Sequence, residues 1–445
     1  MEIPSKLLSR LSIASEIVRK HDFIHIFSHY DADGIASAGV IARSLHRAGK
    51  EYCVTLFEVL SDENMEKIEN DHSKCIILTD IGASHLDRLD VLKKDVIVLD
   101  HHRAPGDSKK ICYVNPHLFG SDGAVECCGS SLSYLFATSL DKNNTDLVQI
   151  ALAGIVGDKQ HLRGMSGINS VILKDAVKNG HVKILDGSVI PFGALTRELF
   201  LSFEPYISGI SGNSKGVLEM LDNAGVSKDA NFSDLDENAV RRLSSMIALR
   251  LLSKNVTTDV MNEMLQPRFI LLGWNTDAST FANMLDACGR LGMGGIGIGT
   301  CLGDQRCKAE AERLNDDYRN KIVEAAKELE TRGLEQGKFI QYFDSSTSGF
   351  TGVLCGIAMR FFGISDKPTV GINTSEPTAK ASARGTPALI ERGLDLSAAM
   401  GTAGKEAGGG GGGHNIASGA SFPSGSFKKF IVSLDKTVGG QINAK

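Results

Sequence analysis

Three short apolar segments, at 23–27, 75–79 and 96–99, each end in acidic or histidine side chains, and this repetition constrains the fold most strongly. The residues that follow the three segments are His29, Asp31 and Asp33; Asp80; and Asp100, His101 and His102. Helical apolar spacing separates the segments, which is the rhythm of parallel strands joined by helices. Because ligands bind at the carboxyl ends of such strands, we expect these side chains to gather at one sheet edge.

The surrounding sequence predicts the rest of this α/β sheet. Apolar residues at helical spacing occupy 7–18, a further strand is expected at 52–57, and a helix is expected at 83–93. This alternation predicts a parallel sheet with helices on both faces. The apolar stretch 151–156, which we expect to be a helix beside the same edge, leads into a further acidic residue, Asp158.

Four carboxylates and two or three imidazoles at one place would repel one another unless cations lay between them, so the sequence predicts a metal centre. Its candidate ligands are His29, Asp31, Asp33, Asp80, His101 and Asp158. Oxygen and imidazole ligands without a thiolate favour Mn²⁺, with Mg²⁺, Zn²⁺ or Co²⁺ as substitutes. The ligands exceed the need of one ion and suit two ions about 3.5–4 Å apart, an arrangement that hydrolyses phosphoesters.

Each part of this pattern also has an ordinary structural explanation. Asp31 and Asp33 before a glycine are typical of a turn, and Asp80 or Asp158 alone is typical of a helix N-cap. Adjacent histidines are commonly surface residues. The joint occurrence of all the parts in this order, each at the end of an element, favours the metal centre.

The composition limits what surrounds this centre. A chain of 445 residues exceeds a single core, so two or three domains are expected. A net charge of −5 argues against a broad basic face for duplex DNA. The nine cysteines form no C-x-x-C pair, which favours reduced core thiols over zinc sites or disulfides. Without an apolar run of about 18 residues or a signal peptide, we expect a cytoplasmic protein with no membrane partner.

Four stretches carry a family resemblance: HYDADG (29–34), TDIG (79–82), LDHHR (99–103) and VGDK (156–159). Together they resemble the motifs of the DHH phosphoesterase superfamily. That superfamily includes RecJ exonucleases, oligoribonucleases, cyclic-dinucleotide phosphodiesterases and family II pyrophosphatases. The resemblance implies a parallel-sheet catalytic domain over residues 1–190.

The resemblance also implies how the centre is arranged. One ion would be held by His29, Asp31 and Asp80, and the other by Asp33, Asp80, His101 and Asp158. A water activated between the two ions would attack phosphorus. His102 would offset charge on the phosphate oxygens, and Asp100 would orient His101 or His102.

The first ligand departs from the pattern of several family members, which have a histidine at the position of Phe27. His29, two residues before Asp31, is the expected replacement, as in the H-x-D-x-D variant of archaeal relatives. His25 is the alternative. Strand alternation places His25 on the same side as Phe27, where packing in the interior is expected.

The C-terminal region, 336–445, resembles the DHH-associated domain of nucleases in this family. The matching stretches are TGVLCGIAMRFF (351–362), KASARGT (380–386) and GGGGGGHNIASGASFP (408–423). The resemblance implies a smaller α/β domain that binds substrate through Ser382, Arg384, Gly412, Gly413 and His414. Glycines let backbone N–H groups approach a phosphate, and Arg384 can pair with it bidentately. On composition alone the glycine run would be a flexible linker and Arg384 a surface residue.

The middle segment, 195–335, is expected to be an α/β insertion. Helical spacing occurs at 237–253 and 308–332, and FILLGW is expected to be a strand. The glycines at 292–299 do not follow the order of a dinucleotide fingerprint and are expected to form packing turns. NMLDACGRLG is similar to archaeal RecJ-like proteins, including the GINS-associated nuclease group, which implies docking of a replication-complex partner such as GINS.

The expected function is that of a RecJ-like exonuclease, which hydrolyses single-stranded DNA or RNA from an end with a water activated by two metal ions. One alternative is a small-substrate phosphoesterase acting on short oligonucleotides, phosphoadenosine phosphate or cyclic dinucleotides. Another is a replication scaffold. The intact ligand set argues against the scaffold, and the middle insertion argues against a compact small-substrate enzyme. DNA or RNA preference, polarity and oligomeric state stay open.

Overall fold

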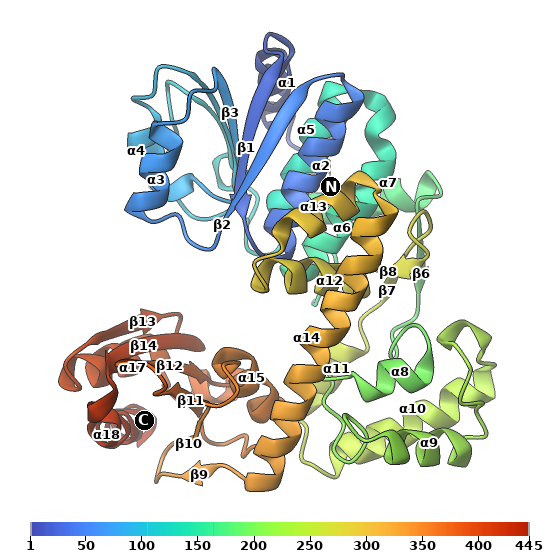
Figure 1. Ribbon diagram of the computed structural model, residues 1–445, viewed down its shortest axis with the longest axis vertical. Helices are drawn as coiled ribbons and strands as arrows, with labels where there is room; N and C mark the ends of the chain where they lie inside the picture. The colour runs from blue at the N-terminus through green and yellow to red at the C-terminus, as the bar shows by residue number, and fades with distance from the viewer. Residues whose placement is uncertain (1, 105, 163, 444–445) are drawn as a thin grey trace. The chain divides into compact units, whose positions relative to one another are not determined.

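The computed structural model describes residues 2–104, 106–162 and 164–443 (Figure 1). The chain forms two compact units. The first comprises Met1–Gly187 and Leu265–Asp317, and the second comprises Ser188–Met264 and Tyr318–Lys445. The segment 195–335, which the sequence predicts as one insertion, is therefore divided between the two units.

The first unit is built on a five-stranded parallel sheet with the strand order β2-β1-β3-β4-β5. The strands are β1 (Phe23–His29), β2 (Glu51–Phe57), β3 (Cys75–Thr79), β4 (Asp95–Leu99) and β5 (Cys112–Val114). All five residues of β3 are buried, which is typical of a central strand covered on both faces. The predicted parallel sheet is confirmed.

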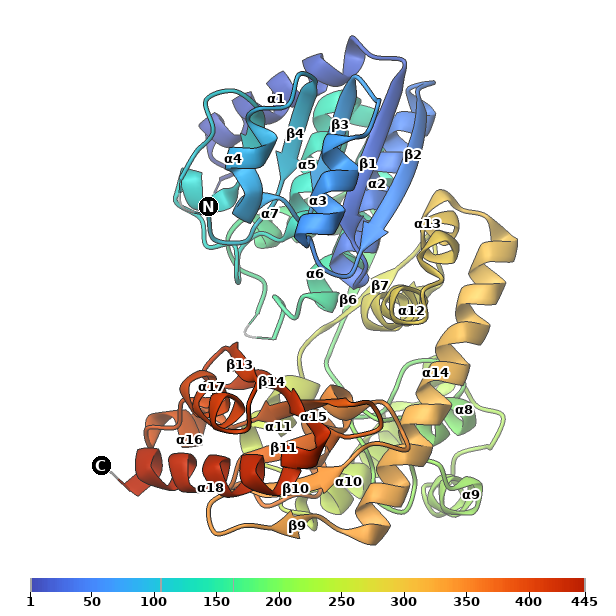
Figure 2. The ribbon, with the colours of Figure 1, turned by 60° about the vertical axis from the view of Figure 1, so that its left-hand side comes forward.

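Helices cover both faces of this sheet, as predicted (Figures 1 and 2). On one face, α1 (Ser5–Arg19), α2 (Ala32–Arg47) and α5 (Gly129–Leu140) enclose a core with Ile24 and Ile26 of β1. On the other face, α3 (Asp62–Glu69) and α4 (Leu86–Leu89) pack with Phe27. Successive side chains of β1 thus enter opposite cores, because a strand alternates its faces.

Further elements of the first unit follow the sheet. They are α6 (Val148–Gly157), α7 (Gly167–Lys178), α12 (Ala278–Arg290), α13 (Gly294–Leu302) and the start of α14 (Gln305–Arg332), with a small antiparallel sheet of β6 (Val182–Leu185), β7 (Arg268–Leu271) and β8 (Thr276–Asp277). α6 packs against α2 and α5, so that its C-terminal end reaches the carboxyl end of the sheet.

Two local predictions were wrong. The expected helix over 83–93 is only a 3₁₀ turn, Ala83–His85, followed by α4, because the chain must extend again to start β4 at Asp95. The glycines expected to form turns at 292–299 lie largely in α13. A Cβ at Gly294 would come within 2.3 Å of Leu56 Cδ1, so close packing outweighs the poor helix propensity of glycine.

The second unit begins with helices and ends with a mixed sheet. The helices of its first part are α8 (Leu195–Phe200), α9 (Ser214–Asn223), α10 (Glu237–Leu252) and α11 (Thr258–Met264). The sheet has the order β13-β14-β12-β11-β10-β9, with β10 and β11 parallel and the other pairs antiparallel. Its strands are β9 (Glu335–Gln336), β10 (Gln341–Asp344), β11 (Thr369–Asn373), β12 (Thr378–Arg384), β13 (Gly410–Gly413) and β14 (Ala417–Pro423).

Helices α15 (Thr351–Phe361), α16 (Pro387–Glu391), α17 (Leu396–Glu406) and α18 (Phe427–Asn443) complete this smaller α/β domain. The glycine run is an edge strand and not a linker. A Cβ at Gly411 would lie 2.5 Å from the carbonyl oxygen of Met400 in α17. This helix can therefore approach β13 only because Gly411 has no side chain. Among the described residues, the structure contains no helix long and apolar enough to cross a membrane.

Candidate metal centre

The ends of β1 and β3 bring the first set of predicted ligands together. His29, Asp31 and Asp80 each offer one nitrogen or oxygen atom within 4.8 Å of the others. His29 Nδ1 lies 3.0 Å from Asp31 Oδ2 and 3.7 Å from Asp80 Oδ2. The prediction that His29 joins this cluster in place of Phe27 therefore agrees with the geometry.

The same place receives the remaining predicted ligands. Asp80 forms a group with His101 and His102, while Asp33 and Asp158 form another group with the thiol of Cys128. His101 Nε2 lies 3.1 Å from Asp80 Oδ1, and His101 Nδ1 lies 4.0 Å from Asp158 Oδ2. All six predicted ligands thus converge at the carboxyl end of the sheet.

Asp80 occupies the middle of this cluster in an unusual state. Its backbone has a φ of 60°, a left-handed conformation that few residues other than glycine adopt. The residue is 2% exposed, and its Oδ1 atom has no hydrogen-bond partner among the described residues. A buried carboxylate oxygen without a donor is costly, and a bound cation would remove that cost.

His101 supports the same conclusion. Its Nδ1 lies 2.7 Å from the carbonyl oxygen of Gly123, which can only accept a hydrogen bond, so Nδ1 carries the proton. In the neutral ring, Nε2 therefore directs a lone pair at Asp80 Oδ1. Two acceptors that face each other need a proton or a metal ion between them. The donor set of oxygen and imidazole atoms fits divalent cations.

The close approach of these carboxylates and imidazoles shifts their pKa values. Burial alone would lower the pKa of His29, but Asp31 and Asp80 outweigh burial and raise it to about 10. Burial alone would raise the pKa of Asp80, but His101 and His29 hold it well below its usual range. Burial and the charge of Asp80 raise the pKa of Asp33 to about 6. Without metal ions, the cluster therefore keeps protons that cations would displace.

Asp33 is fixed by the first turn of α5. Its Oδ2 accepts a hydrogen bond from the backbone N–H of Gly129 at 2.8 Å, and its Oδ1 accepts one from the N–H of Ser130 at 3.0 Å. A Cβ at Gly154 would lie 2.6 Å from Oδ1, so glycine at that position leaves room for the carboxylate. Helix ends rather than strand ends thus hold this ligand.

Asp100 orients His102 and not His101. Its Oδ1 lies 2.8 Å from His102 Nδ1, and its Oδ2 accepts a hydrogen bond from the N–H of Ala83 at 2.7 Å. The hydrogen bond that His102 Nδ1 donates to Asp100 raises the pKa of His102. The His102 side chain is 59% exposed, so solvent and a substrate can reach its ring.

His25 lies outside this cluster. Its Nδ1 pairs with Asp71 Oδ2 at 2.8 Å, its Nε2 contacts Thr55 Oγ1 at 2.9 Å, and its ring stacks on Phe27 at 3.9 Å. His25 and Phe27 therefore pack together on one face of the sheet, as strand alternation predicts.

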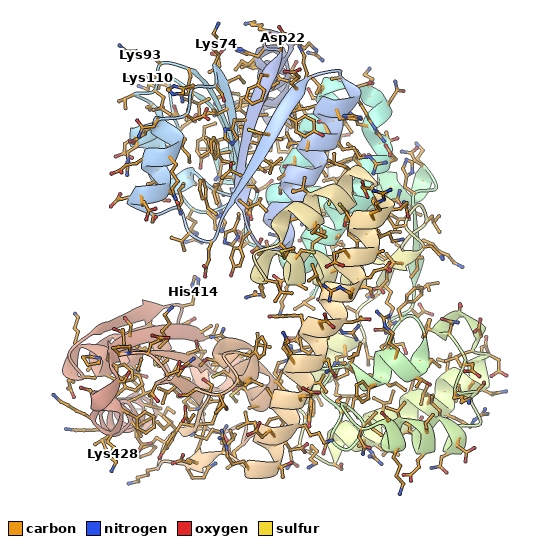
Figure 3. The ribbon with its side chains drawn as sticks, viewed as in Figure 1. Asp22, Lys74, Lys93, Lys110, His414 and Lys428 are labelled. Carbon is orange, nitrogen blue, oxygen red and sulfur yellow. The ribbon has the colours of Figure 1, made fainter. Side chains whose placement is uncertain are left out.

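The five predicted substrate-binding residues lie in the second unit. Ser382 and Arg384 belong to β12, Gly412 and Gly413 belong to β13, and His414 follows directly. β14 lies between the two strands, and its Gly419 pairs with both Ser382 and Gly412. The exposed His414 side chain points away from its own sheet (Figure 3).

Ser382 and Arg384 converge on the N-terminal end of α15. A Cβ at Gly352 would lie 3.5 Å from Arg384 Nη2 and 3.6 Å from Ser382 Oγ. A guanidinium, a hydroxyl and a helix N-terminus in one place are favourable for a phosphate.

The sequence of this chain matches two family models and one curated relative. The DHH family N-terminal domain matches residues 23–155, and the DHHA1 domain matches residues 338–440. An uncharacterized protein of Methanocaldococcus jannaschii is 30% identical over 442 residues, which cover 97% of this chain and 96% of that protein. This chain belongs to the DHH family. It is therefore a DHH phosphoesterase, and such proteins are metal-dependent hydrolases that bind divalent metals.

Solved structures share the whole fold of this DHH protein. Exonuclease RecJ bound to manganese has a TM-score of 0.61 at 16% identity, covering 98% of this chain and 95% of that one. CDC45 from Entamoeba histolytica has a TM-score of 0.64 at 12% identity, covering 99% and 100%. RecJ from Thermus thermophilus in complex with Mn²⁺ has a TM-score of 0.58 at 16% identity, covering 98% and 55%.

Sequence reasoning missed a buried polar network behind the DHH motifs. The Gln160 side chain donates hydrogen bonds to the carbonyl oxygen of Gly123 and to Asp158 Oδ2, both at 2.7 Å. Asn169 Nδ2 donates to Gln160 Oε1 at 2.7 Å, and Ser131 Oγ donates to Asn169 Oδ1 at 2.6 Å. Gln160 therefore orients Asp158 directly and shares with His101 the carbonyl that fixes its ring. The position of Gln160, two residues after Asp158, was the sequence feature that could have indicated this role.

The thiol of Cys128 was also missed, because all nine cysteines were interpreted as core thiols. They are all free, and seven are buried. Cys128 Sγ nevertheless lies 3.2 Å from Asp33 Oδ1. Burial, Asp33 and Asp158 raise the pKa of this thiol well above its usual range. The prediction of a ligand environment without sulfur is thus incomplete.

Proposed function

We propose that this DHH phosphoesterase is a RecJ-like exonuclease that hydrolyses single-stranded DNA or RNA from an end. The observation that carries the proposal is the buried Asp80 carboxylate between two sets of ligands, whose Oδ1 atom has no hydrogen-bond partner among the described residues. Such a carboxylate is suited to serve two cations at once. The similarity of fold to RecJ supports a nucleic-acid substrate.

We propose two divalent ions, Mn²⁺ before Mg²⁺ or Co²⁺. His29, Asp31 and Asp80 would hold one ion, and Asp33, Asp80, His101 and Asp158 would hold the other. When bound, two such ions supply Lewis-acid stabilisation of the charge that develops on the phosphate and make a nearby water more acidic.

Residues of this chain would orient the substrate phosphate and stabilise its negative charge. Asp100 holds His102 through Nδ1, and the His102 side chain is 59% exposed, so Nε2 would donate a hydrogen bond to a phosphate oxygen. The Gly123 carbonyl keeps the proton of His101 on Nδ1, which leaves Nε2 free to act as a ligand.

In the second unit, Ser382 and Arg384 lie beside the first turn of α15 and would bind a phosphate of the single-stranded nucleic acid there. Gly412 and Gly413 would offer backbone N–H groups to the same nucleic-acid substrate, since no Cβ blocks the approach to these two glycines, and His414 would offer its imidazole.

We further propose that the segment 195–335 docks a replication-complex partner such as GINS and that the protein acts in the cytoplasm.

The test compares products from three end-labelled substrates: single-stranded DNA, single-stranded RNA and dinucleotides, each with Mn²⁺. Wild-type protein is compared with Asp80→Asn and with the control Asp71→Asn, which changes an acidic residue at the opposite end of β3. We expect mononucleotides from long strands, lost in Asp80→Asn and retained in Asp71→Asn. Cleavage of dinucleotides alone would support the small-substrate alternative, and no cleavage by metal-loaded protein would support the scaffold.

A further inference from the structure

We propose that Cys128 supplies a sulfur ligand to the ion position formed by Asp33 and Asp158, which makes this position a mixed oxygen and sulfur site for thiophilic divalent ions such as Zn²⁺ or Co²⁺. The inference rests on the metal centre proposed above. It assigns to that centre a ligand that the sequence motifs do not contain.

The position of the sulfur atom carries the proposal. Asp33, Cys128 and Asp158 each offer one atom within 4.8 Å of the other two. Cys128 Sγ lies 3.2 Å from Asp33 Oδ1, and the residue is 0% exposed. A small movement of these side chains toward a common centre would bring all three atoms into the coordination shell of one ion.

Polar atoms around Gly129, the residue that follows the cysteine, point independently to a missing cation. A Cβ on Gly129, the next residue, would lie 2.8 Å from Asp80 Cβ and 3.0 Å from both Asp33 Oδ2 and Ser37 Oγ. Of these neighbours, Asp80 Oδ1 and Ser37 Oγ are buried without a hydrogen-bond partner in the described part of the chain. Buried oxygen atoms without donors are rare, and a cation at this place would satisfy the carboxylate.

The surroundings of Cys128 also suit a bound thiolate. The residue is the N-cap of α5, where backbone N–H groups and the helix dipole favour negative charge. Its Sγ also lies 3.2 Å from Ser130 Oγ and 3.4 Å from Ser131 Oγ, but these hydroxyls donate their hydrogens to the carbonyl oxygen of Ala151 and to Asn169 Oδ1. As the sulfur–metal bond forms, the thiol proton leaves to solvent, so charge and atoms balance.

Sulfur changes the choice of metal at this position. Thiolate ligands favour Zn²⁺ and other borderline-soft ions, whereas Mn²⁺ and Mg²⁺ prefer oxygen. The group of His29, Asp31 and Asp80 consists of nitrogen and oxygen ligands, so it keeps the preference for Mn²⁺. The two positions of one centre would therefore take different ions when both are available.

Cobalt provides a direct test because a thiolate ligand gives Co²⁺ a near-ultraviolet charge-transfer band. Metal-free full-length protein would be titrated with Co²⁺ as wild type, as Cys128→Ser and as the control Cys127→Ser. Cys127 is equally buried, and its Sγ contacts the carbonyl oxygen of Cys128 at 3.9 Å. We expect the band in wild type and in Cys127→Ser and its complete loss in Cys128→Ser, while weaker visible cobalt bands remain.

X-ray absorption of the zinc-loaded wild-type protein makes the test independent of any variant, in case Cys128→Ser fails to fold. The expected result is a sulfur scatterer at about 2.3 Å from zinc. Zinc bound with oxygen and nitrogen neighbours alone, or a cobalt band that persists in folded Cys128→Ser, would overturn the sulfur ligand while leaving the metal centre intact. Failure to bind either ion would overturn the centre itself.

Discussion

The two proposed ion positions of the centre differ in how the protein holds their candidate ligands. At the first, the side chains of His29 and Asp31 are 27% and 36% exposed; His29 is the last residue of β1, and Asp31 is the N-cap of α2. At the second, Asp33 and Cys128 are buried, and helix ends and hydrogen bonds fix them. The difference indicates that Asp33 and Cys128 are preformed, whereas His29, Asp31 and also Asp158, whose side chain is 33% exposed, can exchange with water and substrate.

Matched amide substitutions test this difference most strongly. Asp31→Asn and Asp33→Asn each remove one charged ligand, so hydrolysis should fall by about 10²-fold or more in both. Stability should separate them. Asn replaces Asp well at an N-cap, so Asp31→Asn should change the free energy of unfolding by less than about 0.5 kcal/mol.

Asp33→Asn should lower that free energy by about 1–3 kcal/mol, because its NH₂ group would face the backbone N–H groups of α5. Chemical denaturation of the metal-free variants measures both values. Equal losses of stability would show that the two positions are held alike.

The polar network behind the second position predicts the next effect. Gln160→Ala should weaken metal binding there by about 10–100-fold, because Asp158 and the carbonyl that orients His101 lose their shared donor. Calorimetric titration with Mn²⁺ should then show one weakened and one unchanged site. The control is Gln149→Ala, a buried glutamine that contacts Gly273 instead. The prediction fails if both glutamine variants bind two ions like wild type.

The protons held without metal predict a pH dependence. The pKa is about 7 for folded Asp158 against 3.8 when unperturbed, and about 10 for His29 against 6.5. Both groups bind protons more tightly when folded, so the free energy of unfolding should fall as pH rises. Between about pH 6 and about pH 8, we expect a loss of about 3 kcal/mol in the metal-free protein.

Saturating Mn²⁺ should reverse this slope, because metal binding displaces those protons and strengthens as they leave. Denaturation curves at several pH values, with and without Mn²⁺, provide the comparison. Parallel slopes in the two series would mean that the titrating groups are not the ligands.

The second unit predicts a smaller effect on binding alone. Arg384→Lys keeps the charge but loses the planar pair of donors, so KM for a single-stranded substrate should rise about tenfold while kcat changes little. Arg392→Lys, an exposed arginine on the same domain, should leave both constants unchanged. A large fall in kcat for Arg384→Lys would contradict a role limited to phosphate binding.

The sequence was sufficient where topology alone places a residue. His29, Asp80 and His101 follow parallel strands, and the carboxyl ends of such strands must meet at one edge. Asp158 was predictable because an apolar helix of ten residues ends just before it. Strand alternation places His25 and His29 on the same face of β1, so only the position of His29 at the carboxyl end of the strand distinguished it from His25.

Other features depend on tertiary contacts that no local pattern contains. Cys128 lies 95 residues from Asp33 in the chain, so its place among the ligands appears only when α5 docks on α2. α13 is helical because its glycines pack closely against Leu56 and Ile35, although glycine is a poor helix former. Packing therefore decides both features, and local propensity does not.

Anomalous diffraction from Mn²⁺-soaked crystals tests the central claim most directly. Two peaks about 3.5–4 Å apart are expected, one beside His29 and Asp31 and one beside Asp33 and Asp158, with the Asp80 carboxylate touching both. A single peak that Asp80 does not touch, or no peak at the carboxyl end of this sheet, would contradict the account.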